Sequence, residues 1–364
     1  MAETTITVDG KVLSRVYAGA SVIDAAQYLM PYPEVFIVCD ANVADYAVRV
    51  EEGLSHAGNF KGTLLIRATE ETKTMDTVLK ICEFLLSGGA SRKAMVFAIG
   101  GGITTDMAGF AASIYKRGCK FAFLPTTLLS QVDAGIGGKT GVNYESLKNM
   151  IGIIRQPEFT YECPEVLETL PYRDFVSGTA ELLKTFIIDN GAGLYGRAVN
   201  VLSKISNSSD KAFAIRENRE DLIQMIAASA AVKAGVVSRD QFENGERRKL
   251  NLGHTFAHAI EHEARLKKVD IAHGEAVSMG MVLAAKLSEK VGIAELGLES
   301  MIRENLRVCG LPVECPFPLE SLAAAMKLDK KAEAGGRIHF VLIAGIGNVV
   351  MKDMTVEEVE ALLK

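Results

Sequence analysis

Short apolar runs rich in β-branched and aromatic residues alternate with helical patterns in the first half of the chain. The runs Val35–Asp40, Thr63–Ala68, Ala94–Gly100 and Phe121–Leu124 each have the length of a buried strand. Between two of them, Thr74–Ser87 repeats its apolar residues at helical spacing. This alternation is typical of a sheet of parallel strands connected by helices.

The pattern changes after a proline-rich stretch. Three prolines fall within residues 156–171, and most of the chain beyond them has helical spacing, as in Ile215–Val232 and Gly274–Val291. We therefore expect an α/β, Rossmann-like domain with a parallel sheet in residues 1–165. A mainly α-helical domain is expected in residues 166–364.

Two strand-like runs return near the end of the chain. Arg337–Ile343 and Asn348–Met351 flank the turn Gly-Ile-Gly and predict a hairpin. The chain has 364 residues, of which 48% are hydrophobic and 23% charged. Because domains usually contain about 100–200 residues, this length and composition fit a globular protein of two domains.

Composition excludes several classes of function. The formal net charge of −5 argues against non-specific nucleic-acid binding, which needs a basic surface. No apolar run approaches the roughly 18 residues of a membrane span, and no basic-then-apolar leader opens the sequence, so we expect a cytoplasmic protein without a membrane partner. The six cysteines form no C-x-x-C pair, which favours reduced thiols over disulfides or a thiolate zinc site.

Histidine spacing indicates metal chemistry. His254 and His258 lie one helical turn apart, and His273 follows in HGEAVSMG, although the chain has only six histidines. Glu181 could complete a divalent-metal site of mixed nitrogen and oxygen ligands that stays open to a substrate. By spacing alone, His254 pairs with His258, as in zinc helices with ligands at i and i+4. A core histidine bonded to a backbone carbonyl is the alternative for His258.

A glycine cluster, Gly100–Asp106, follows a predicted strand and precedes the helical pattern Met107–Tyr115. Glycines there allow the backbone to approach a pyrophosphate, and a helix N-terminus offers free N–H donors. The cluster is not a full G-x-G-x-x-G, because Thr105 stands at the third glycine, and a tight turn without a ligand is the alternative. Asp40, which ends a strand, could accept hydrogen bonds from ribose hydroxyls.

A second glycine-rich run, Pro125–Asn143, can present backbone N–H groups and a lysine to an anion. It matches a Walker A loop only if Asp133 takes the place of the first glycine, so ATP hydrolysis is disfavoured. Cations among apolar residues further along suggest a pocket for a substrate with more than one negative group, although each could instead be a solvated surface side chain. They are Lys148, Lys184, Lys233 and Arg247.

The chain contains, in this order, the segments GGGITTDMAGF, YKRG, PTTLLSQVDAGIGGKTGVN, KNMIG, AELLK, ENGERRKLNLGHTFAHAIEH, HGEAVSMGM and LDKK. They resemble the successive motifs of the 3-dehydroquinate synthase family, and the resemblance runs from about Asp40 to the final hairpin. It implies an NAD-binding domain, a helical domain that binds Zn²⁺ or Co²⁺, and a homodimer. The implied reaction converts 3-deoxy-D-arabino-heptulosonate 7-phosphate into 3-dehydroquinate and phosphate in the shikimate pathway.

The resemblance also assigns residues. It makes Glu181, His254 and His273 the metal ligands and leaves His258 for the substrate, while Arg117 reaches the neighbouring subunit's site. The implied substrate-binding and catalytic residues are Lys139, Lys148, Asn149, Lys184, Lys233, Arg247, Asn251, His258 and a lysine of Lys330 and Lys331, with Asp133 and Glu243 as acidic partners. The implied NAD contacts are Asp40, Asn42, Glu70, Lys73, Gly101, Gly102, Asp106, Thr126, Thr127, Lys139 and Lys148.

The implied reaction oxidises a hydroxyl with NAD⁺, eliminates phosphate, returns the hydride and closes a ring by an intramolecular aldol step. The chain departs from the family where Ala134 and Gly135 replace the usual serine pair. Sister sugar-phosphate cyclases, a metal-dependent polyol-phosphate dehydrogenase and a non-catalytic regulator are the alternatives. Arg247, Asn251 and His258 favour the dehydroquinate reaction.

Overall fold

The computed structural model describes residues 2–145, 147–329 and 337–364. Contacts divide the chain into two compact units. The first combines residues 1–170 with 215–242, and the second combines residues 171–214 with 243–364. Residues 215–242 therefore contact the first unit although they follow residue 170 in the chain. The two domains expected from the prolines, 1–165 and 166–364, stay a prediction.

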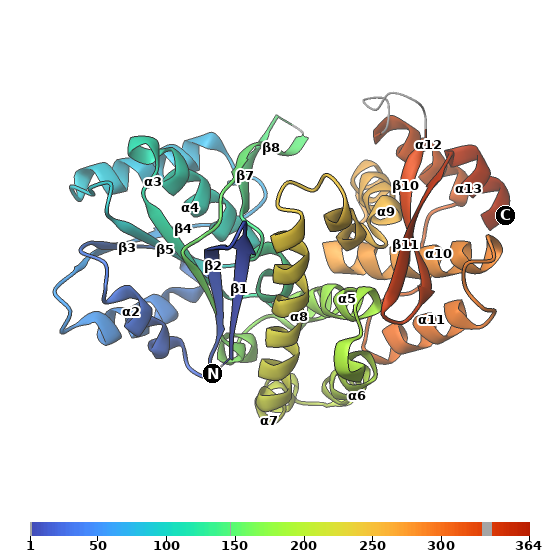
Figure 1. Cartoon of the computed structure of the whole chain (residues 1–364), viewed down its shortest axis with the longest axis horizontal. Helices are drawn as coiled ribbons and strands as arrows, with labels where there is room; N and C mark the ends of the chain where they lie inside the picture. The colour runs from blue at the N-terminus through green and yellow to red at the C-terminus, as the bar shows by residue number, and fades with distance from the viewer. Residues whose placement is uncertain (1, 146, 330–336) are drawn as a thin grey trace. The chain divides into compact units, whose positions relative to one another are not determined.

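A seven-stranded sheet forms the centre of the first unit (Figure 1). Its order is β1-β2-β9-β6-β5-β3-β4, and every neighbouring pair except the antiparallel β1 and β2 is parallel. The strands are β1 (Ala2–Val8), β2 (Lys11–Ala18), β3 (Val35–Asp40), β4 (Phe60–Ile66), β5 (Met95–Gly100), β6 (Lys120–Pro125) and β9 (Phe159–Glu162). The predicted parallel sheet is therefore confirmed, with β3 to β6 at the four predicted runs.

Helices cover both faces of this sheet, which explains why its central strands are continuous apolar runs. Phe36 and Val38 of β3 belong to the apolar core under α3 (Met75–Ser87) and α4 (Gly102–Ile114). On the opposite face, the ring of Phe97 lies by that of Phe159, which contacts Tyr28. That face is covered by α1 (Ala26–Leu29), which carries Tyr28, and by α2 (Ala44–Leu54), which contacts β3 and β4.

Helix α8 (Arg219–Arg239) joins the first unit although it follows the sheet by many residues. Its Ala230, Ala234 and Val237 form an apolar cluster with Ile6 of β1 and Val16 of β2. Among the described residues, α8 is the one helix long and apolar enough to cross a membrane, and half of its apolar window is buried. This burial against β1 and β2 is typical of a core helix.

The predicted helix Ile215–Val232 is divided between two helices, because α7 (Lys211–Glu217) ends before α8 begins.

Helix α10 (His273–Lys290) is the centre of the second unit and packs against α5, α9, α11 and β10. The antiparallel hairpin predicted near the end of the chain is present as β10 and β11. The helical second region predicted from the sequence is confirmed. The remaining elements are α5 (Tyr172–Ile188), α6 (Leu194–Asn207), α9 (His254–Lys267), α11 (Leu298–Val308), α12 (Leu319–Asp329), β10 (Ile338–Gly345), β11 (Asn348–Met354) and α13 (Val356–Leu363).

A second, two-stranded sheet in the first unit was not predicted. It consists of the antiparallel strands β7 (Lys139–Tyr144) and β8 (Leu147–Ile154), which are formed by part of the second glycine-rich run and the residues after it. Most residues of β8 are exposed.

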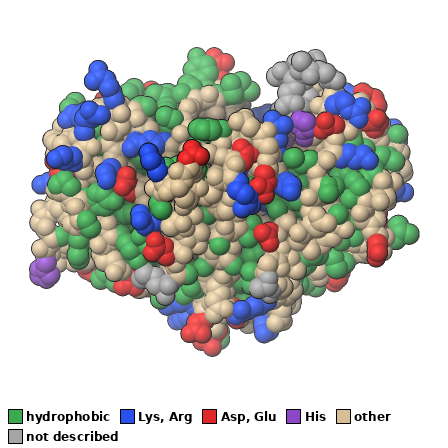
Figure 2. Space-filling view, in the orientation of Figure 1, with side chains coloured by type: hydrophobic (Ala, Val, Ile, Leu, Met, Phe, Trp, Pro, Cys, Tyr) green, Lys and Arg blue, Asp and Glu red, His purple; other side chains and the backbone are tan. Residues whose placement is uncertain are grey.

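On the face of the molecule shown in Figure 2, acidic and basic side chains are interspersed rather than gathered into one wide basic area.

Candidate metal centre and cofactor region

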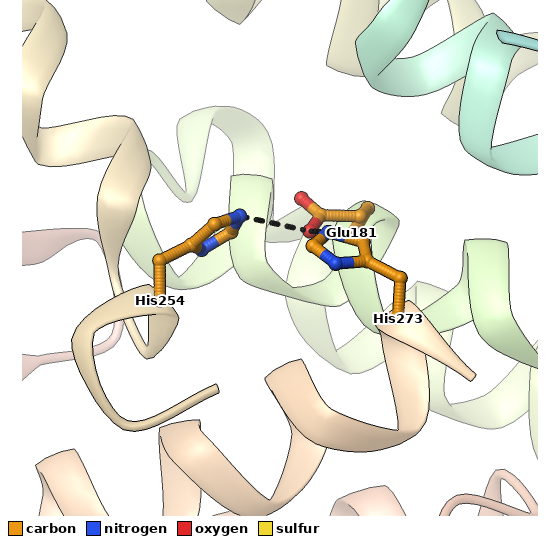
Figure 3. A group of neighbouring side chains, drawn as sticks. All are labelled: Glu181, His254 and His273. Atoms are coloured by element: carbon orange, nitrogen blue, oxygen red, sulfur yellow. Dashed lines mark ion pairs between the residues drawn. The ribbon is translucent and has the colours of Figure 1, made fainter. Parts of the chain in front are cut away.

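Three side chains of the second unit converge on one point (Figure 3). The Oε1 atom of Glu181 lies 3.5 Å from Nε2 of His254 and 3.4 Å from Nε2 of His273. One ligand atom from each residue lies within 4.8 Å of the others. Glu181 comes from the middle of α5, whereas the histidines are the first residues of α9 and α10. We call these three residues the Glu–His–His cluster.

Outer contacts orient both imidazole rings. Nδ1 of His254 lies 3.1 Å from the carbonyl oxygen of Leu252, and Nδ1 of His273 lies 3.4 Å from Oε1 of Glu261. Because a carbonyl oxygen and a carboxylate only accept hydrogen bonds, each Nδ1 is placed to carry the proton and donate it. In the neutral imidazole, Nε2 then keeps its lone pair and faces Glu181, as in many metal-binding histidines.

The charges within the cluster are strongly coupled. Burial favours the neutral acid of Glu181, but Lys184 and the two histidines outweigh it and hold the pKa of this carboxyl well below its usual range. Burial, reinforced by Lys184, lowers the pKa of His254 to about 4. Burial opposes the charge on His273, yet its contacts with Glu181 and Glu261 raise its pKa to about 10.

The donor atoms of the cluster fit a divalent metal ion. Glu181 is 1% exposed, and among the described residues neither of its carboxylate oxygens has a hydrogen-bond partner with good geometry. Its Oε2 forms an ion pair at 2.5 Å with Lys184, which leaves Oε1 facing the two imidazoles. Two imidazole nitrogens and one carboxylate oxygen are a common ligand set of catalytic zinc, in which a further position stays open.

His258 is not one of the three converging side chains. It is exposed, and its ring centroid lies 5.7 Å from that of His254 in an edge-to-face arrangement. Although helical spacing alone pairs His254 with His258, the structure brings His254 together with His273 instead. His258 therefore lies beside the cluster on α9.

In the first unit, the glycine cluster forms the turn between β5 and α4. Gly101 precedes the first residue of α4, Gly102, so the N-terminus of this helix lies at the carboxyl end of a central strand. Asp106, one turn into α4, accepts a hydrogen bond from the buried Lys73 at 2.6 Å, and Lys73 also donates to Asn149 at 2.5 Å. Burial raises the pKa of Asp106 to about 6, although Lys73 offsets part of the shift.

The other residues implied to bind the cofactor follow the carboxyl ends of neighbouring strands. Asp40 ends β3 and accepts a hydrogen bond from the backbone N–H of Asn42 at 3.1 Å. Thr126 and Thr127 follow β6, and the backbone N–H of Thr126 bonds to the carbonyl of Gly100 at the end of β5. Parallel strands end along the same edge of a sheet, so these residues are brought to that edge.

Glu70 lies on a loop after β4. Its Oε2 accepts a hydrogen bond of 2.8 Å from the side chain of Asn143 in β7. Asn143 also accepts, through its side-chain oxygen, the backbone N–H of Asn149 at 2.9 Å. Since Asn149 in turn bonds to Lys73, these contacts connect the loop to the hairpin β7–β8.

Asp133 and Lys233 form a second charged group in the first unit. Asp133 lies on a π-helical turn, Ser130–Ala134, and its carboxylate is ion-paired with Lys233 of α8. Lys233 also donates to the backbone carbonyl of Asp133 at 2.7 Å. Lys139 and Lys148 are exposed on the hairpin β7–β8.

The remaining candidates are distributed over both units. In the second unit, Arg247 is buried, and the side chain of Asn251 donates to Glu243 at 2.9 Å. In the first unit, Arg117 is exposed and has a positive φ of 67°. Lys330 and Lys331 lie outside the described residues.

Sequence reasoning missed the outer contacts of the cluster. Glu261 lies two helical turns after His254 on α9, so helical spacing places it on the same side of that helix, and this signal could have found it. The carbonyl of Leu252 has no side-chain signal. Both contacts depend on where α9 and α10 begin.

The chain is similar to known proteins in both sequence and structure. The family model described as 3-dehydroquinate synthase N-terminal matches residues 63–177, and that described as 3-dehydroquinate synthase C-terminal matches residues 178–332. A 3-dehydroquinate synthase of Pyrococcus abyssi is 43% identical over 294 residues, which are 81% of this chain and 82% of the relative.

Solved structures of other enzymes share the fold. The 2-epi-5-epi-valiolone synthase of Streptomyces hygroscopicus subsp. jinggangensis, with NAD⁺ and Zn²⁺ bound, has a TM-score of 0.83 at 28% identity and covers 97% of this chain and 96% of its own. A 2-deoxy-scyllo-inosose synthase, complexed with carbaglucose-6-phosphate, NAD⁺ and Co²⁺, has a TM-score of 0.80 at 22% identity and covers 100% and 99%. At that identity the second structure supports the fold alone.

Proposed function

The chain belongs to the 3-dehydroquinate synthase family, and we propose that it converts 3-deoxy-D-arabino-heptulosonate 7-phosphate into 3-dehydroquinate and phosphate. The Glu–His–His cluster is the observation that carries this proposal, because its two histidines and one carboxylate could hold a metal ion and are the ligands that the family resemblance implies. One cyclase with a solved structure, the 2-epi-5-epi-valiolone synthase, is 28% identical, whereas the synthase of Pyrococcus abyssi is 43% identical. The dehydroquinate reaction is therefore preferred to that of a sister cyclase.

We assign the cluster to one divalent ion, Zn²⁺ or Co²⁺. A bound ion of this kind supplies Lewis-acid polarisation of an alcohol or ketone oxygen. Oε1 of Glu181 and the Nε2 atoms of His254 and His273 would hold it. Leu252 and Glu261 keep the two rings oriented, and Lys184 holds the second oxygen of Glu181.

We assign NAD to the edge of the first unit's sheet where β3, β5 and β6 end. NAD supplies a hydride acceptor that gives the hydride back within one turnover. The N-terminus of α4, behind Gly101 and Gly102, offers backbone N–H groups to the pyrophosphate. Asp40 is placed to accept hydrogen bonds from ribose hydroxyls, and Lys73 is held beside Asp106.

We propose that a set of cations binds the two anionic groups of the substrate. The buried guanidinium of Arg247 suits bidentate binding of a carboxylate. Lysines held around the phosphate would fix its position, so that a phosphate oxygen itself accepts the proton of the neighbouring carbon and no strong protein base is needed. The proposed substrate contacts are Asp133, Lys139, Lys148, Asn149, Lys184, Lys233, Glu243, Arg247, Asn251, His258 and one of Lys330 and Lys331.

We also propose a homodimer in which Arg117 reaches the neighbouring subunit. Arg117 is exposed, and the hairpin β7–β8 exposes four large apolar side chains, Tyr144, Leu147, Met150 and Ile153. Apolar groups gathered on one short hairpin favour contact with a partner. Light scattering at micromolar concentration should give twice the mass of one chain, and Leu147→Lys should shift it towards a monomer. A monomeric wild-type protein would contradict the proposal.

The cytoplasm is the proposed compartment. All six cysteines are free thiols in the structure, and four of them are buried. Unpaired thiols are expected in a reducing environment.

Turnover with a trace of NAD⁺ tests the proposed function. The protein, Zn²⁺ and 3-deoxy-D-arabino-heptulosonate 7-phosphate should yield phosphate and 3-dehydroquinate in equal amounts without net NADH. Activity only on another sugar phosphate would indicate a sister cyclase. Accumulation of NADH would indicate a dehydrogenase.

A further inference from the structure

Helix α10 contacts both other helices that contribute to the Glu–His–His cluster. It carries His273 at its first position and packs against α5, which carries Glu181, and α9, which begins with His254. Two glycines of α10, Gly274 and Gly280, lie at these contacts. In each case the glycine touches the backbone of the neighbouring segment, close in sequence to a residue of the cluster.

Gly274 lies against α5. A Cβ atom on Gly274 would stand 1.9 Å from the backbone oxygen of Ser177 and 2.5 Å from its carbonyl carbon. The backbone N–H of Gly274 also donates to Oγ of Ser177 at 3.0 Å. Ser177 lies one helical turn before Glu181, and Gly274 directly follows His273. A close approach of α5 and α10 therefore lies beside the Glu181–His273 contact.

Gly280 lies against the residue before α9. A Cβ atom on Gly280 would stand 2.2 Å from the backbone oxygen of Gly253 and 3.2 Å from the backbone nitrogen of Ala257. Gly253 has a positive φ of 77°, and its own added Cβ would meet the backbone nitrogen of Met281 at 3.0 Å. Because His254 directly follows Gly253, this contact lies next to the backbone from which the His254 side chain extends.

We propose that Gly274 and Gly280 are positioning residues that set the spacing of the Glu–His–His cluster, so that alanine at either position lowers the affinity for a divalent ion. This inference rests on the proposed function, which assigns a metal ion to the cluster. Real Cβ atoms essentially never lie within 3.0 Å of backbone, so either alanine must push one helix away from its neighbour. Zinc–ligand distances of about 2.0–2.2 Å tolerate changes of only about 0.2 Å.

The affinity for Zn²⁺, measured by competition with a chromophoric chelator, tests the inference. Gly274→Ala and Gly280→Ala should each weaken binding by about tenfold or more, the effect of losing an outer support of a metal site. The absorption spectrum of bound Co²⁺ should change as well, since it reports ligand geometry. Gly196→Ala is the matched control, because Gly196 lies in α6 and an added Cβ there meets nothing within 4 Å.

A second control separates positioning from loss of stability. Gly109 of α4 is also tightly packed, with an added Cβ 2.6 Å from Cγ2 of Thr140, but it lies in the first unit. Gly109→Ala should lower the unfolding temperature and leave Zn²⁺ affinity unchanged. If Gly274→Ala does not fold, Ser177→Ala replaces it, removing only the hydroxyl that bonds to Gly274, and should weaken Zn²⁺ binding severalfold.

The outcomes distinguish the inference from the function on which it rests. Wild-type affinity in folded Gly274→Ala and Gly280→Ala proteins overturns the inference, as does an equal loss in Gly109→Ala. Wild-type affinity in Ser177→Ala overturns it where that variant replaces Gly274→Ala. Equal Zn²⁺ affinity of the wild-type and His273→Ala proteins instead overturns the metal centre itself.

Discussion

The Nδ1 atom of His273 lies 3.4 Å from Oε1 of Glu261, while Nε2 of the same ring faces Glu181. One carboxylate thus orients the ring and the other belongs to the Glu–His–His cluster. Carboxylates in this outer position fix the tautomer of a metal-binding histidine and increase its basicity.

We predict that Glu261→Ala lowers Zn²⁺ affinity by about 10- to 100-fold, because the ring of His273 loses its orienting acceptor. Glu261→Gln keeps an acceptor oxygen and should recover much of this loss. Glu263→Ala is the control, since Glu263 lies on the same helix and pairs with Lys267 at 3.1 Å. Competition with a chelator measures the affinities, and an unchanged value in Glu261→Ala would contradict the assigned role.

His273→Ala should remove the bound metal and abolish turnover, because one of three ligands is lost. NAD binding should persist, since the residues proposed to contact NAD lie in the other unit. His258→Ala should keep the metal and lose turnover, which separates a substrate contact from a ligand. Elemental analysis by mass spectrometry gives the metal content, and full occupancy in His273→Ala would rule out this ligand.

Lys73→Met should weaken NAD binding and destabilise the first unit. Lys73 and Asp106 pair at 2.6 Å with side-chain exposures of 6% and 19%, so removing the lysine leaves a buried carboxyl without its cation. The expected loss of stability is roughly 3 kcal/mol. Calorimetric titration with NAD⁺ and denaturant unfolding measure the two effects, with the exposed Lys80→Met as the control. Wild-type NAD affinity would remove Lys73 from the cofactor region.

Arg247→Ala should weaken substrate binding by about 1.5–3 kcal/mol, the scale of a hydrogen bond to a charged group. Arg247 is 3% exposed, which strengthens its interaction with a carboxylate. Binding of a substrate analogue to the metal-loaded protein measures the loss, and the exposed Arg265→Ala serves as the control. The same substitution should leave NAD affinity unchanged. An unaltered affinity for the analogue would exclude Arg247 from the substrate contacts.

Glu162 predicts a pH dependence of stability. Its side chain is fully buried at the end of β9, and among the described residues neither carboxyl oxygen has a hydrogen-bond partner. Burial raises the pKa of Glu162 well above its usual range. The folded protein therefore keeps a proton that the unfolded chain loses above its pKa of about 4.3. Because the folded state then binds more protons, the free energy of unfolding falls as pH rises from that value towards the folded pKa.

Glu162→Gln should not show this contribution. Its stability relative to wild type should increase by about 1.4 kcal/mol per pH unit above about pH 4.3, until the pH reaches the folded pKa of Glu162. Denaturant unfolding at several pH values between 5 and 8 measures the difference. A constant difference across this range would show that Glu162 is not a buried neutral acid.

The central strands were predictable because helices cover both faces of the sheet. Strand β3 coincides with the predicted run Val35–Asp40, and its first five residues are fully buried. Strand β1, at the edge of the sheet, and its neighbour β2 were missed because both are only partly buried and polar residues interrupt their apolar ones. The position of α8 against Ile6 and Val16 depends on contacts between distant segments, which periodicity does not record.

The Glu–His–His cluster, too, was only partly predictable from local sequence patterns. The residue types and the spacing in HGEAVSMG indicated metal chemistry, but helical spacing alone favoured His258 over His273. Only the crossing of α10 with α5 brings His273 within 3.4 Å of Glu181. The family resemblance supplied this pairing because it carries the arrangement of a fold, whereas local periodicity describes one helix at a time.

Metal-dependent turnover tests the central claim most directly. The protein stripped of metal by a chelator is mixed with trace NAD⁺ and 3-deoxy-D-arabino-heptulosonate 7-phosphate, and phosphate release is followed as Zn²⁺ is added. We predict no release without metal, full activity at one Zn²⁺ per chain, and 3-dehydroquinate equal to phosphate with no net NADH. Equal turnover by the metal-free protein, or NADH accumulating in step with substrate loss, would contradict the account.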